Sequence, residues 1–362
     1  MSELRPRRVL IMAGGTGGHV IPALSLAKAL RDMGVEVEWL GSPRGIENRL
    51  VPEADIRLNR VVVSGLRGKG AVGWLLAPFR LLRALQQAIG VIRRVDPQLV
   101  VGLGGFASGP GGLAAWLLRR PLVIHEQNAV AGLTNRVLSR LARRTYAAFP
   151  QAFAAGKAIL VGNPVRPEIA ALGESPRRAD EMRGRALRLL VVGGSLGAQS
   201  LNERLPEALA MLPERQRPEV HHQAGRDKDD ATRAVYLAQG VTAEVTAFID
   251  DMASAYDWAD LVICRAGALT VAELAAAAKA ALFVPFPHAV DDHQTANAAA
   301  LVEQGAASLL PQSEMSAARL AGMLGVLLVP ETLASMAACA RKGARLDAVE
   351  QLVAGCMETG FE

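Results

Sequence analysis

Two glycine-rich turns carry the residue types best suited to binding a phosphate. The first, at residues 14–19 (GGTGGH), follows an apolar run, and the second, at residues 193–197 (GGSLG), follows another apolar run half a chain later. An apolar strand that ends in such a turn before a helix presents backbone N–H groups to a phosphate. One turn is a weak signal, but two at this separation predict twin nucleotide-type domains with a ligand held between them.

His19 ends the first turn, at the expected start of a helix. The helix dipole disfavours an imidazolium there, so His19 could act as a neutral base that takes a proton from an attacking hydroxyl. Thr16, Gly17 and Gly18 could meet a ligand through a hydroxyl and backbone amides. The third glycine of a dinucleotide fingerprint would fall at Val20, which argues against NAD. Two structural alternatives stay open: His19 caps or packs the helix, and the glycines serve only tight strand–helix packing.

Two further loops follow consecutive strands of the first half. Residues 102–112 hold six glycines in eleven positions, and Glu126 and Asn128 follow the next apolar run. Loops after neighbouring parallel strands lie side by side at the carboxyl edge of a sheet. Glu126 and Asn128 could therefore bind sugar hydroxyls or orient His19, and the alternative is that they cap the next helix.

In the second half, residues 264–273 (CRAGALTVAE) run from a strand into a helix. Amide groups at this helix start could meet a diphosphate, and Glu273, one turn further on, could reach a ribose. Thr270 and Glu273 also have the spacing of a capping box, which is an equally good structural explanation. Asp291 and Asp292 precede His293, but consecutive side chains diverge and no third ligand is evident, so no metal is predicted.

Apolar strands alternate with helical segments along the whole chain. Strands are expected at 9–13, 35–40, 99–103, 122–125, 158–161, 187–192, 241–248, 261–264 and 281–284, and helices at 21–33, 202–211, 269–277 and 295–304. This alternation predicts an α/β protein with two doubly wound, Rossmann-like domains that face a cleft. A boundary in the segment VGNPVR gives domains at 1–163 and 164–341, with a final helix at about 342–362 that packs back onto the first domain.

Length and composition set broad limits. A chain of 362 residues exceeds the usual size of one hydrophobic core, so two domains are the default expectation. Cys264, Cys339 and Cys356 lack the spacing of a zinc site or a disulfide framework. No apolar run approaches the roughly 18 residues of a membrane span, and the start of the chain lacks the apolar core of a signal peptide. A cytoplasmic protein is therefore expected.

Charge is distributed unevenly along the chain. Lys and Arg exceed Asp and Glu by 13 through Asn163, whereas the remainder has an excess of 8 acidic residues. Aromatic residues make up only 4% of the chain and no basic run is interleaved with them, so nucleic-acid binding is not predicted. The basic first half is better suited to an anionic membrane surface or a diphosphate-bearing partner.

Residues 73–94 form the best candidate for a partner surface. On a helix, their large apolar side chains, which include Trp74, Leu75, Phe79 and Leu82, cover an arc of roughly 160°, wider than one sheet face needs. With basic neighbours such a face could enter a bilayer interface. A wide core face explains the same pattern, and this alternative stays open.

Several of these segments together resemble one family. Residues 14–19, 104–112, 125–128, 131–135, 162–166, 193–198 and 267–273 are similar, in the same order, to the bacterial MurG family of lipid-linked peptidoglycan N-acetylglucosaminyltransferases. The resemblance spans nearly the whole chain. It implies a two-domain glycosyltransferase of the GT-B type, inverting, metal-independent and without a cofactor. Such an enzyme moves N-acetylglucosamine from UDP to the C4 hydroxyl of the muramoyl sugar on undecaprenyl-diphosphoryl-muramoyl-pentapeptide (lipid I), giving lipid II.

The resemblance also assigns roles to residues. It places the donor contacts on Thr16, Gly17, Gly18, Asn128, Arg166, Ser195, Ile249, Ala268, Leu269, Thr270, Val271, Ala272, Glu273 and Gln294. It implies that the uracil lies near Ile249, the diphosphate at the turn amides and the ribose at Glu273. His19, alone or in a relay with Glu126, is then the expected catalytic base.

The resemblance further implies a peripheral enzyme at the cytoplasmic face of the bacterial inner membrane, without a transmembrane segment. Its membrane patch would be formed by Trp74, Leu75, Phe79, Leu82 and Trp116. The implied partners are UDP-N-acetylglucosamine, lipid I, the anionic membrane surface and other cell-wall synthesis proteins. Two other functions stay open. A UDP-N-acetylglucosamine epimerase of the same fold would leave the apolar surface of residues 74–82 unexplained, and a non-catalytic nucleotide-binding module would not need a histidine at the cleft.

Overall fold

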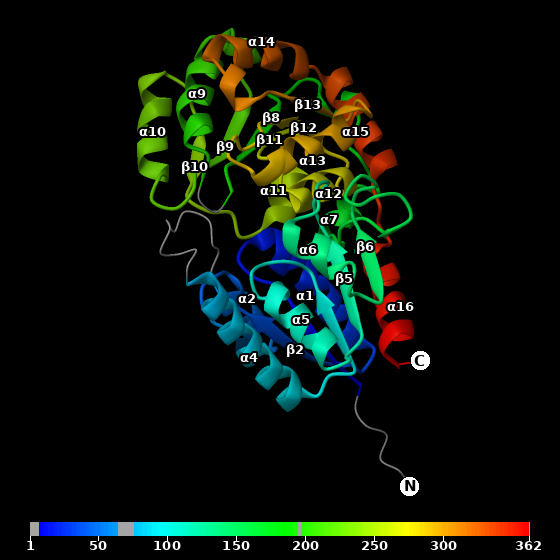
Figure 1. Cartoon of the computed structure of the whole chain (residues 1–362). Helices are drawn as coiled ribbons and strands as arrows, with labels where there is room; N and C mark the ends of the chain where they lie inside the picture. The colour runs from blue at the N-terminus through cyan, green and yellow to red at the C-terminus, as the bar shows by residue number, and fades with distance from the viewer. Residues whose placement is uncertain (1–6, 64–75, 195–196, 362) are drawn as a thin grey trace. The chain divides into compact units, whose positions relative to one another are not determined.

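A computed structural model describes residues 7–63, 76–194 and 197–361 and divides the chain into two compact units (Figure 1). The first unit joins the chain up to Val165 with the C-terminal segment from Leu346, and the second unit is Arg166–Arg345. Three of the predicted site residues, Trp74, Leu75 and Ser195, lie outside the described residues.

The first unit is built on a seven-stranded parallel sheet with the strand order β3-β2-β1-β4-β5-β6-β7. Its strands are β1 (Arg8–Met12), β2 (Glu36–Gly41), β3 (Arg57–Arg60), β4 (Leu99–Gly102), β5 (Leu122–Glu126), β6 (Arg144–Ala147) and β7 (Ile159–Leu160). The central strands are apolar runs because helices cover both faces. The order reverses between β1 and β4, which is where doubly wound sheets bind ligands.

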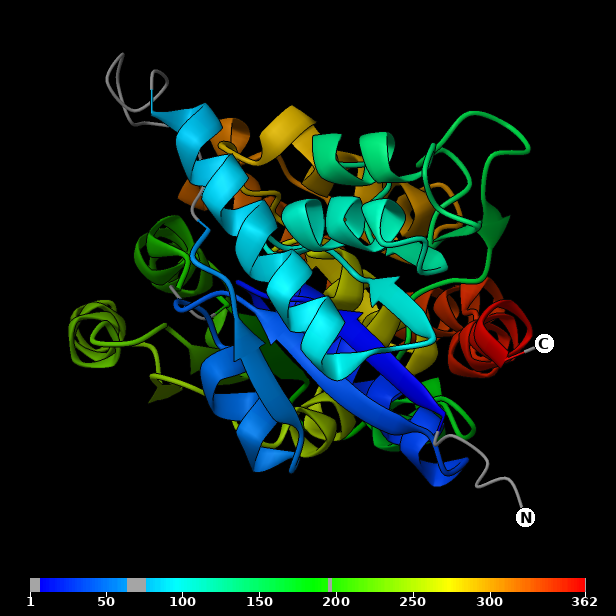
Figure 2. The same cartoon turned by 60° about the horizontal axis from the view of Figure 1, so that its bottom comes forward.

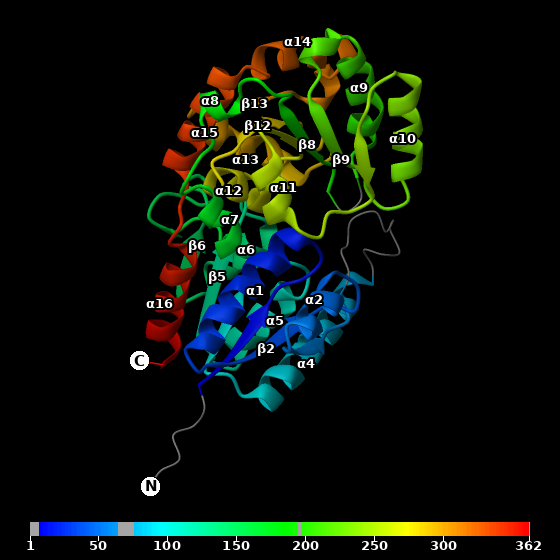
Figure 3. The same ribbon diagram turned by 180° about the vertical axis from the view of Figure 1, so that it is seen from behind.

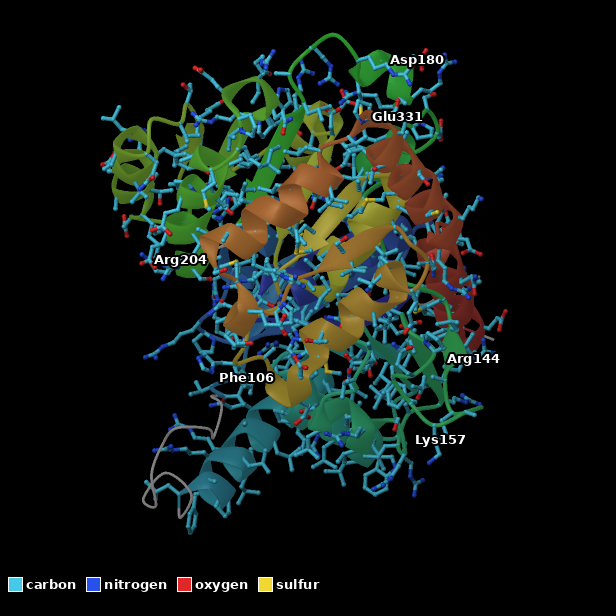
Figure 4. The ribbon with its side chains drawn as sticks, turned by 90° about the horizontal axis from the view of Figure 1, so that it is seen from above. Phe106, Arg144, Lys157, Asp180, Arg204 and Glu331 are labelled. Carbon is cyan, nitrogen blue, oxygen red and sulfur yellow. The ribbon has the colours of Figure 1, made fainter. Side chains whose placement is uncertain are left out.

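Helices cover this sheet on two sides. They are α1 (Gly17–Asp32), α2 (Glu47–Glu53), α4 (Ala77–Val95), α5 (Ser108–Leu117), α6 (Leu133–Leu138) and α16 (Ala348–Phe361). Residues of α1 and the C-terminal α16 share a core with Val9 and Ile11, whereas residues of α4 and α5 share one with Leu10 and Met12 on the opposite face of the sheet. Figure 3 shows α1 and α16, and Figure 2 shows the sheet of this unit with its helices from below. Arg144, which is labelled in Figure 4, lies at the start of β6. It forms an ion pair with Glu358 of α16. This ion pair connects the C-terminal helix α16 to strand β6 of the first sheet.

The second unit has a six-stranded parallel sheet with the order β10-β9-β8-β11-β12-β13, which reverses between β8 and β11. Its strands are β8 (Arg188–Val192), β9 (Glu219–Gln223), β10 (Glu244–Thr246), β11 (Leu261–Cys264), β12 (Ala280–Phe283) and β13 (Ala307–Leu309). Its α-helices are α7 (Pro167–Leu172), α8 (Ala179–Met182), α9 (Gln199–Ala210), α10 (Asp229–Ala238), α11 (Met252–Trp258), α12 (Ala268–Ala276), α13 (His293–Val302), α14 (Ala317–Leu327) and α15 (Pro330–Gly343). Both units are thus doubly wound.

Asp260 forms hydrogen bonds with the segment before β8, the first strand of the second sheet. Its carboxylate, which is fully buried, accepts hydrogen bonds from Arg177 at 2.8 Å, from Arg185 at 2.7 and 2.9 Å, and from the backbone N–H of Arg188 at 2.9 Å. Burial acts to raise the pKa of Asp260, but the hydrogen bonds from Arg185 and Arg177 outweigh it and hold the pKa below its ordinary value. The charged carboxylate therefore stabilises the native state.

Some elements differ from the sequence-based expectation. The strand expected at 241–248 is limited to Glu244–Thr246, and the final helix begins only at Ala348 because α15 ends at Gly343. Strands β3, β6, β9 and β13 are not predicted at all. Their sequences are short or polar, as in the EVHHQ of β9, so they lack the apolar run that marks a strand buried on both faces.

Candidate active site

The chemistry-bearing turns follow the strands on either side of both reversal points. Residues 13–16 follow β1 and residues 103–107 follow β4, while residues 193–198 follow β8 and residues 265–267 follow β11. Strands β1 and β4 are paired neighbours, and so are β8 and β11. Within each unit, two of the predicted loops therefore meet at the position where doubly wound sheets bind ligands.

The two loops of the first unit are in close contact, which requires glycine at two positions. A Cβ on Gly104 (φ +100°) would lie 2.6 Å from His19 Nδ1, and a Cβ on Gly105 (φ +86°) would lie 2.4 Å from the carbonyl oxygen of Gly14. The positive φ angles also disfavour any residue with a side chain. These glycines therefore let the imidazole of His19 pack directly on the neighbouring backbone.

His19 is half-buried and is oriented by Gln127. Its Nδ1 lies 3.1 Å from Oε1 of Gln127, whose Nε2 donates to the carbonyl oxygen of Leu103 at 2.6 Å. Because a carbonyl oxygen only accepts, the amide of Gln127 must turn its Nε2 to Leu103 and its Oε1 to His19. The neutral imidazole then carries its proton on Nδ1, and Nε2 is the nitrogen that can accept another.

Glu126 faces the start of α6. Its Oε1 accepts from the backbone N–H and the side-chain amide of Asn128 at 2.9 and 3.2 Å, and its Oε2 accepts from Gly132 N–H at 3.2 Å and Asn135 Nδ2 at 2.8 Å. These four hydrogen bonds occupy both oxygens of a nearly buried carboxylate. The N-cap residue of α6 is Gly132, and Glu126 binds its backbone N–H, so Glu126 contacts the start of the next helix as the structural alternative expects.

Arg166 and Glu273 form the charged centre of the second unit. Arg166 donates from Nε and Nη2 to Glu273 Oε1 at 3.1 and 2.9 Å, and the hydroxyl of Tyr256 donates to Glu273 Oε2 at 3.4 Å. Glu273 is only 4% exposed. Burial raises the pKa of Glu273, against the opposing effect of Arg166. Two residues that the sequence assigns to the donor are thus brought together.

The start of α12 differs from a capping box. The helix begins at Ala268 with Gly267 as its N-cap, so Thr270 is the third helical residue. Glu273 reaches Arg166 instead of the helix start, and the capping-box interpretation is therefore wrong. The first amides of α12 lie at the carboxyl edge of β11, in the orientation that suits an anion.

The other donor candidates lie on separate loops within their units. Ile249 is half-buried in the segment after β10, and Gln294, at the start of α13, accepts a hydrogen bond from Phe286 N–H at 2.9 Å. In the first unit, Thr16 is the exposed N-cap of α1, and the two glycines after it are half-buried. Each unit therefore groups its own candidates at the carboxyl edge of its own sheet.

Apolar side chains are exposed in the first turns of α4. Phe79 is 72% exposed and Leu82 is 54% exposed, whereas the buried residues of α4 are Ala77 and then a series that begins at Ala84. The core-face interpretation is therefore wrong for these first turns. Trp116 is also exposed, but it comes from the last turn of α5. Helices α4 and α5 pack together. Each returns the chain from one strand of the parallel sheet to the next, so the two helices run in the same direction and Trp116 lies toward the other end of the pair.

Gln127 and Tyr256 are buried residues that sequence reasoning missed. Gln127 lies inside the loop of residues 125–128, so its place directly after a strand was an available signal. Tyr256 lies on α11, 17 positions before Glu273, and no local pattern connects the two.

Two kinds of structure are not found in the described part of the chain. No three His, Cys, Asp or Glu side chains are arranged there as metal ligands. No single described helix is long and apolar enough to cross a membrane; Ala317–Leu327 and Pro330–Phe361 pass that test only as a pair bent by 85°.

Comparison with known proteins identifies the family. The glycosyltransferase family 28 N-terminal domain matches residues 9–147, and the C-terminal domain of the same family matches residues 188–352. A protein from Chromohalobacter salexigens is 71% identical over 358 residues, which are 99% of this chain and 98% of that protein. A protein from Marinobacter nauticus is 54% identical over 360 residues, 99% of each chain. Both are named UDP-N-acetylglucosamine--N-acetylmuramyl-(pentapeptide) pyrophosphoryl-undecaprenol N-acetylglucosamine transferase.

Solved structures agree with this relationship. The crystal structure of MurG from Acinetobacter baumannii matches with a TM-score of 0.81 and 43% identity over 98% of this chain and 100% of that one. A putative UDP-N-acetylglucosamine 2-epimerase from Listeria monocytogenes matches with a TM-score of 0.67 but 15% identity over 98% of this chain and 96% of that one, which shows a shared fold alone. The predicted GT-B fold, with two parallel-sheet α/β domains, is confirmed. The resemblance noted in the sequence is also confirmed, and the chain belongs to the MurG family of glycosyltransferases.

Proposed function

We propose that the chain transfers N-acetylglucosamine from UDP-N-acetylglucosamine to the C4 hydroxyl of the muramoyl sugar of lipid I, giving lipid II and UDP. The near-full-length relationship to MurG proteins is the observation that carries this proposal. In an inverting transfer, the acceptor oxygen bonds to the anomeric carbon as the bond from that carbon to the diphosphate oxygen breaks. The acceptor proton must then pass to a base, and the negative charge that develops on UDP must be stabilised.

The first unit supplies the base in this proposal. The acceptor hydroxyl gives its proton to Nε2 of His19, and Gln127 keeps the proton of the neutral ring on Nδ1. The contacts of Glu126 with Asn128 and the start of α6 support a role in shaping the acceptor loop, not a relay to His19.

The second unit holds the donor in this proposal. Glu273 accepts hydrogen bonds from the ribose, and the amides of α12 and of the glycine turn after β8 face the diphosphate. Of the five N–H donors of an arginine, two of those of Arg166 go to Glu273, and the others can stabilise the leaving diphosphate without a metal. Ile249 lies beside the uracil.

The first turns of α4 support attachment to a membrane. Leu76, Phe79, Leu81 and Leu82, here called the α4 apolar surface, are each at least 40% exposed. Arg80 and Arg83 lie among them and are exposed. Apolar groups that enter the interface, together with basic groups that meet anionic lipids, give reversible attachment. We propose that the protein acts at the cytoplasmic face of the inner membrane, where a lipid-linked acceptor is available.

Radiolabelled UDP-N-acetylglucosamine, incubated with the full-length protein with and without a lipid I analogue, tests the activity. Label that moves to the lipid product only when the analogue is present supports the transfer. Epimerised UDP-sugar, formed without acceptor, would show the epimerase alternative, and unchanged donor in both reactions would favour a non-catalytic binding module.

A further inference from the structure

Gln223, the last residue of β9, reaches across to the glycine turn that follows the neighbouring strand β8. Its side chain is nearly buried, with 3% of the residue exposed. Oε1 accepts a hydrogen bond from Gly194 N–H at 3.0 Å, and Nε2 donates to the Gly194 carbonyl oxygen at 3.1 Å. The backbone carbonyl of Gln223 also accepts from Gly193 N–H at 3.1 Å. One residue thus fixes two successive glycines.

The same side chain also holds a second loop. Nε2 of Gln223 donates to the carbonyl oxygen of Ala247 at 2.9 Å, two positions before Ile249. Strand β9 lies between β8 and β10, so its end is adjacent to the loops that leave both neighbours. Gln223 therefore ties the glycine turn after β8 to the segment after β10, and the proposed function assigns both loops to the UDP donor.

Gly193 and Gly197 pack directly on the backbone at the end of β9, which leaves no room for a side chain at either position. A Cβ on Gly193 would lie 3.0 Å from the Gln223 carbonyl oxygen, and a Cβ on Gly197 would lie 2.0 Å from the Ala224 carbonyl oxygen. Gly194 has φ +84°, in the left-handed region. Glycine adopts this conformation without strain but can also adopt many others, and the Gln223 amide, which bonds both polar groups of Gly194, selects this one.

The hydrogen-bond partners of this amide determine which residue type can form the same hydrogen bonds at position 223. Gly194 N–H needs an acceptor, whereas the carbonyl oxygens of Gly194 and Ala247 need a donor. A glutamine supplies both, and a carboxylate supplies only acceptors. Glutamate at this position would therefore face two carbonyl oxygens with a charged oxygen.

We propose that Gln223 is a positioning residue that holds the two donor loops in the geometry that binds UDP. It acts through Gly194 and the segment at Ala247, without a role in the proton transfer at His19. This inference rests on the proposed donor site in the second unit. It predicts that Gln223 contributes to donor affinity far more than to turnover of the bound complex.

The test measures UDP binding by isothermal titration calorimetry and transfer kinetics on the full-length protein, for Gln223→Glu and Gln223→Met. We expect the Kd for UDP and the KM for UDP-N-acetylglucosamine to rise by about 10–100-fold, as for loss of hydrogen bonds to buried groups. We expect kcat at saturating donor, and the KM for the lipid I analogue, to stay within about 3-fold. Gln239→Glu, an exposed position at the end of α10, is the matched control.

A pH series separates positioning from general damage to the fold. A protonated carboxyl can donate a hydrogen bond, so the UDP affinity of Gln223→Glu, relative to wild type, should recover as the pH falls from about 8 to about 5.5. Gln223→Met, with no polar group, should show no recovery.

Three outcomes overturn the inference: both variants bind UDP within about 2-fold of wild type, or they lose kcat with unchanged UDP affinity, or they show the same pH series. If the wild-type protein itself does not bind UDP, the proposed function fails instead, so the two failures are distinguishable.

Discussion

Replacing Arg166 by alanine should strand a buried carboxylate in the second unit. In the native protein, Arg166 donates two hydrogen bonds to Glu273 Oε1, and the carboxylate also accepts a longer one from the Tyr256 hydroxyl. Breaking a buried pair by removing one partner costs about 3–5 kcal/mol. The side chain of Arg166 is 24% exposed, so partial solvation reduces the expected loss of unfolding free energy to about 2–4 kcal/mol. For a unit of this size that loss lowers Tm by about 5–15 °C.

The stability of Arg166→Ala should depend on pH in a defined direction. Burial already raises the pKa of Glu273, and loss of Arg166 removes an opposing effect, so the pKa rises further. The native state of Arg166→Ala then binds a proton that the unfolded state has released, and stability falls as the pH rises through this interval. The difference in Tm from wild type should therefore be larger at about pH 8 than at about pH 5.

Scanning calorimetry on wild type, Arg166→Ala, Glu273→Gln and the double variant checks this reasoning. If the stranded charge is the cause, Glu273→Gln introduced into Arg166→Ala should recover most of the lost Tm, because a neutral amide is less costly to bury. The stranded charge would be ruled out as the cause by either of two results. The first is a decrease in Tm of the double variant that equals the sum of the decreases in the two single variants, and the second is a decrease in Tm of Arg166→Ala that is identical at both pH values.

Four other perturbations have expected outcomes. His19→Ala should lower kcat by about 10²–10⁴-fold in the transfer assay, and a variant with wild-type turnover would eliminate it as the base. Asp260→Asn should cost about 3–5 kcal/mol in denaturant unfolding at neutral pH, a difference that disappears as acid protonates the wild-type carboxylate below its lowered pKa. Glu47 Oε2 accepts a hydrogen bond from Gly15 N–H at 2.9 Å, so Glu47→Gln should lower both Tm and kcat, and a fall in neither would show that Glu47 does not support the turn that carries His19. Phe79→Ser should weaken cosedimentation with anionic vesicles while leaving UDP binding unchanged, and equal cosedimentation would remove the α4 apolar surface from membrane attachment.

The central strands could be predicted from the sequence because they are buried on both faces. After their first arginine, β1 and β8 are continuous apolar runs that lead into glycine turns, and both features follow directly from helices on either side and a ligand turn at the carboxyl edge. Strand β9 is not predicted from the sequence, because its polar residues have hydrogen-bond partners that are distant in the sequence. His222, for example, forms hydrogen bonds with Tyr236 and Asn202. Local patterns cannot reveal such partners.

The residues of the candidate site also differ in how well the local sequence predicts them. His19, Arg166 and Glu273 stand beside glycine turns or a domain boundary, where the local sequence marks them. Gln127 and Tyr256 act through contacts with residues 108 and 17 positions away, respectively, and their types are also common in ordinary cores. Their roles follow only from knowing which oxygen or nitrogen each one faces.

The two units hold their glycine turns by the same device with different residues. The second glycine of each Gly-Gly pair, Gly15 (φ +93°) and Gly194 (φ +84°), donates its N–H to a buried side-chain oxygen from a neighbouring part of the same sheet edge. In the first unit the acceptor is Glu47, which also accepts from the N–H and hydroxyl of Ser42. All three partners of Glu47 are donors, so a carboxylate fits, whereas Gln223 faces a donor and two carbonyl oxygens, so only an amide fits. Glu47→Gln and Gln223→Glu exchange oxygen and nitrogen at nearly constant side-chain volume. Each substitution should turn a hydrogen bond into a repulsion, so the loss of unfolding free energy should exceed what a loss of contact area alone would cause.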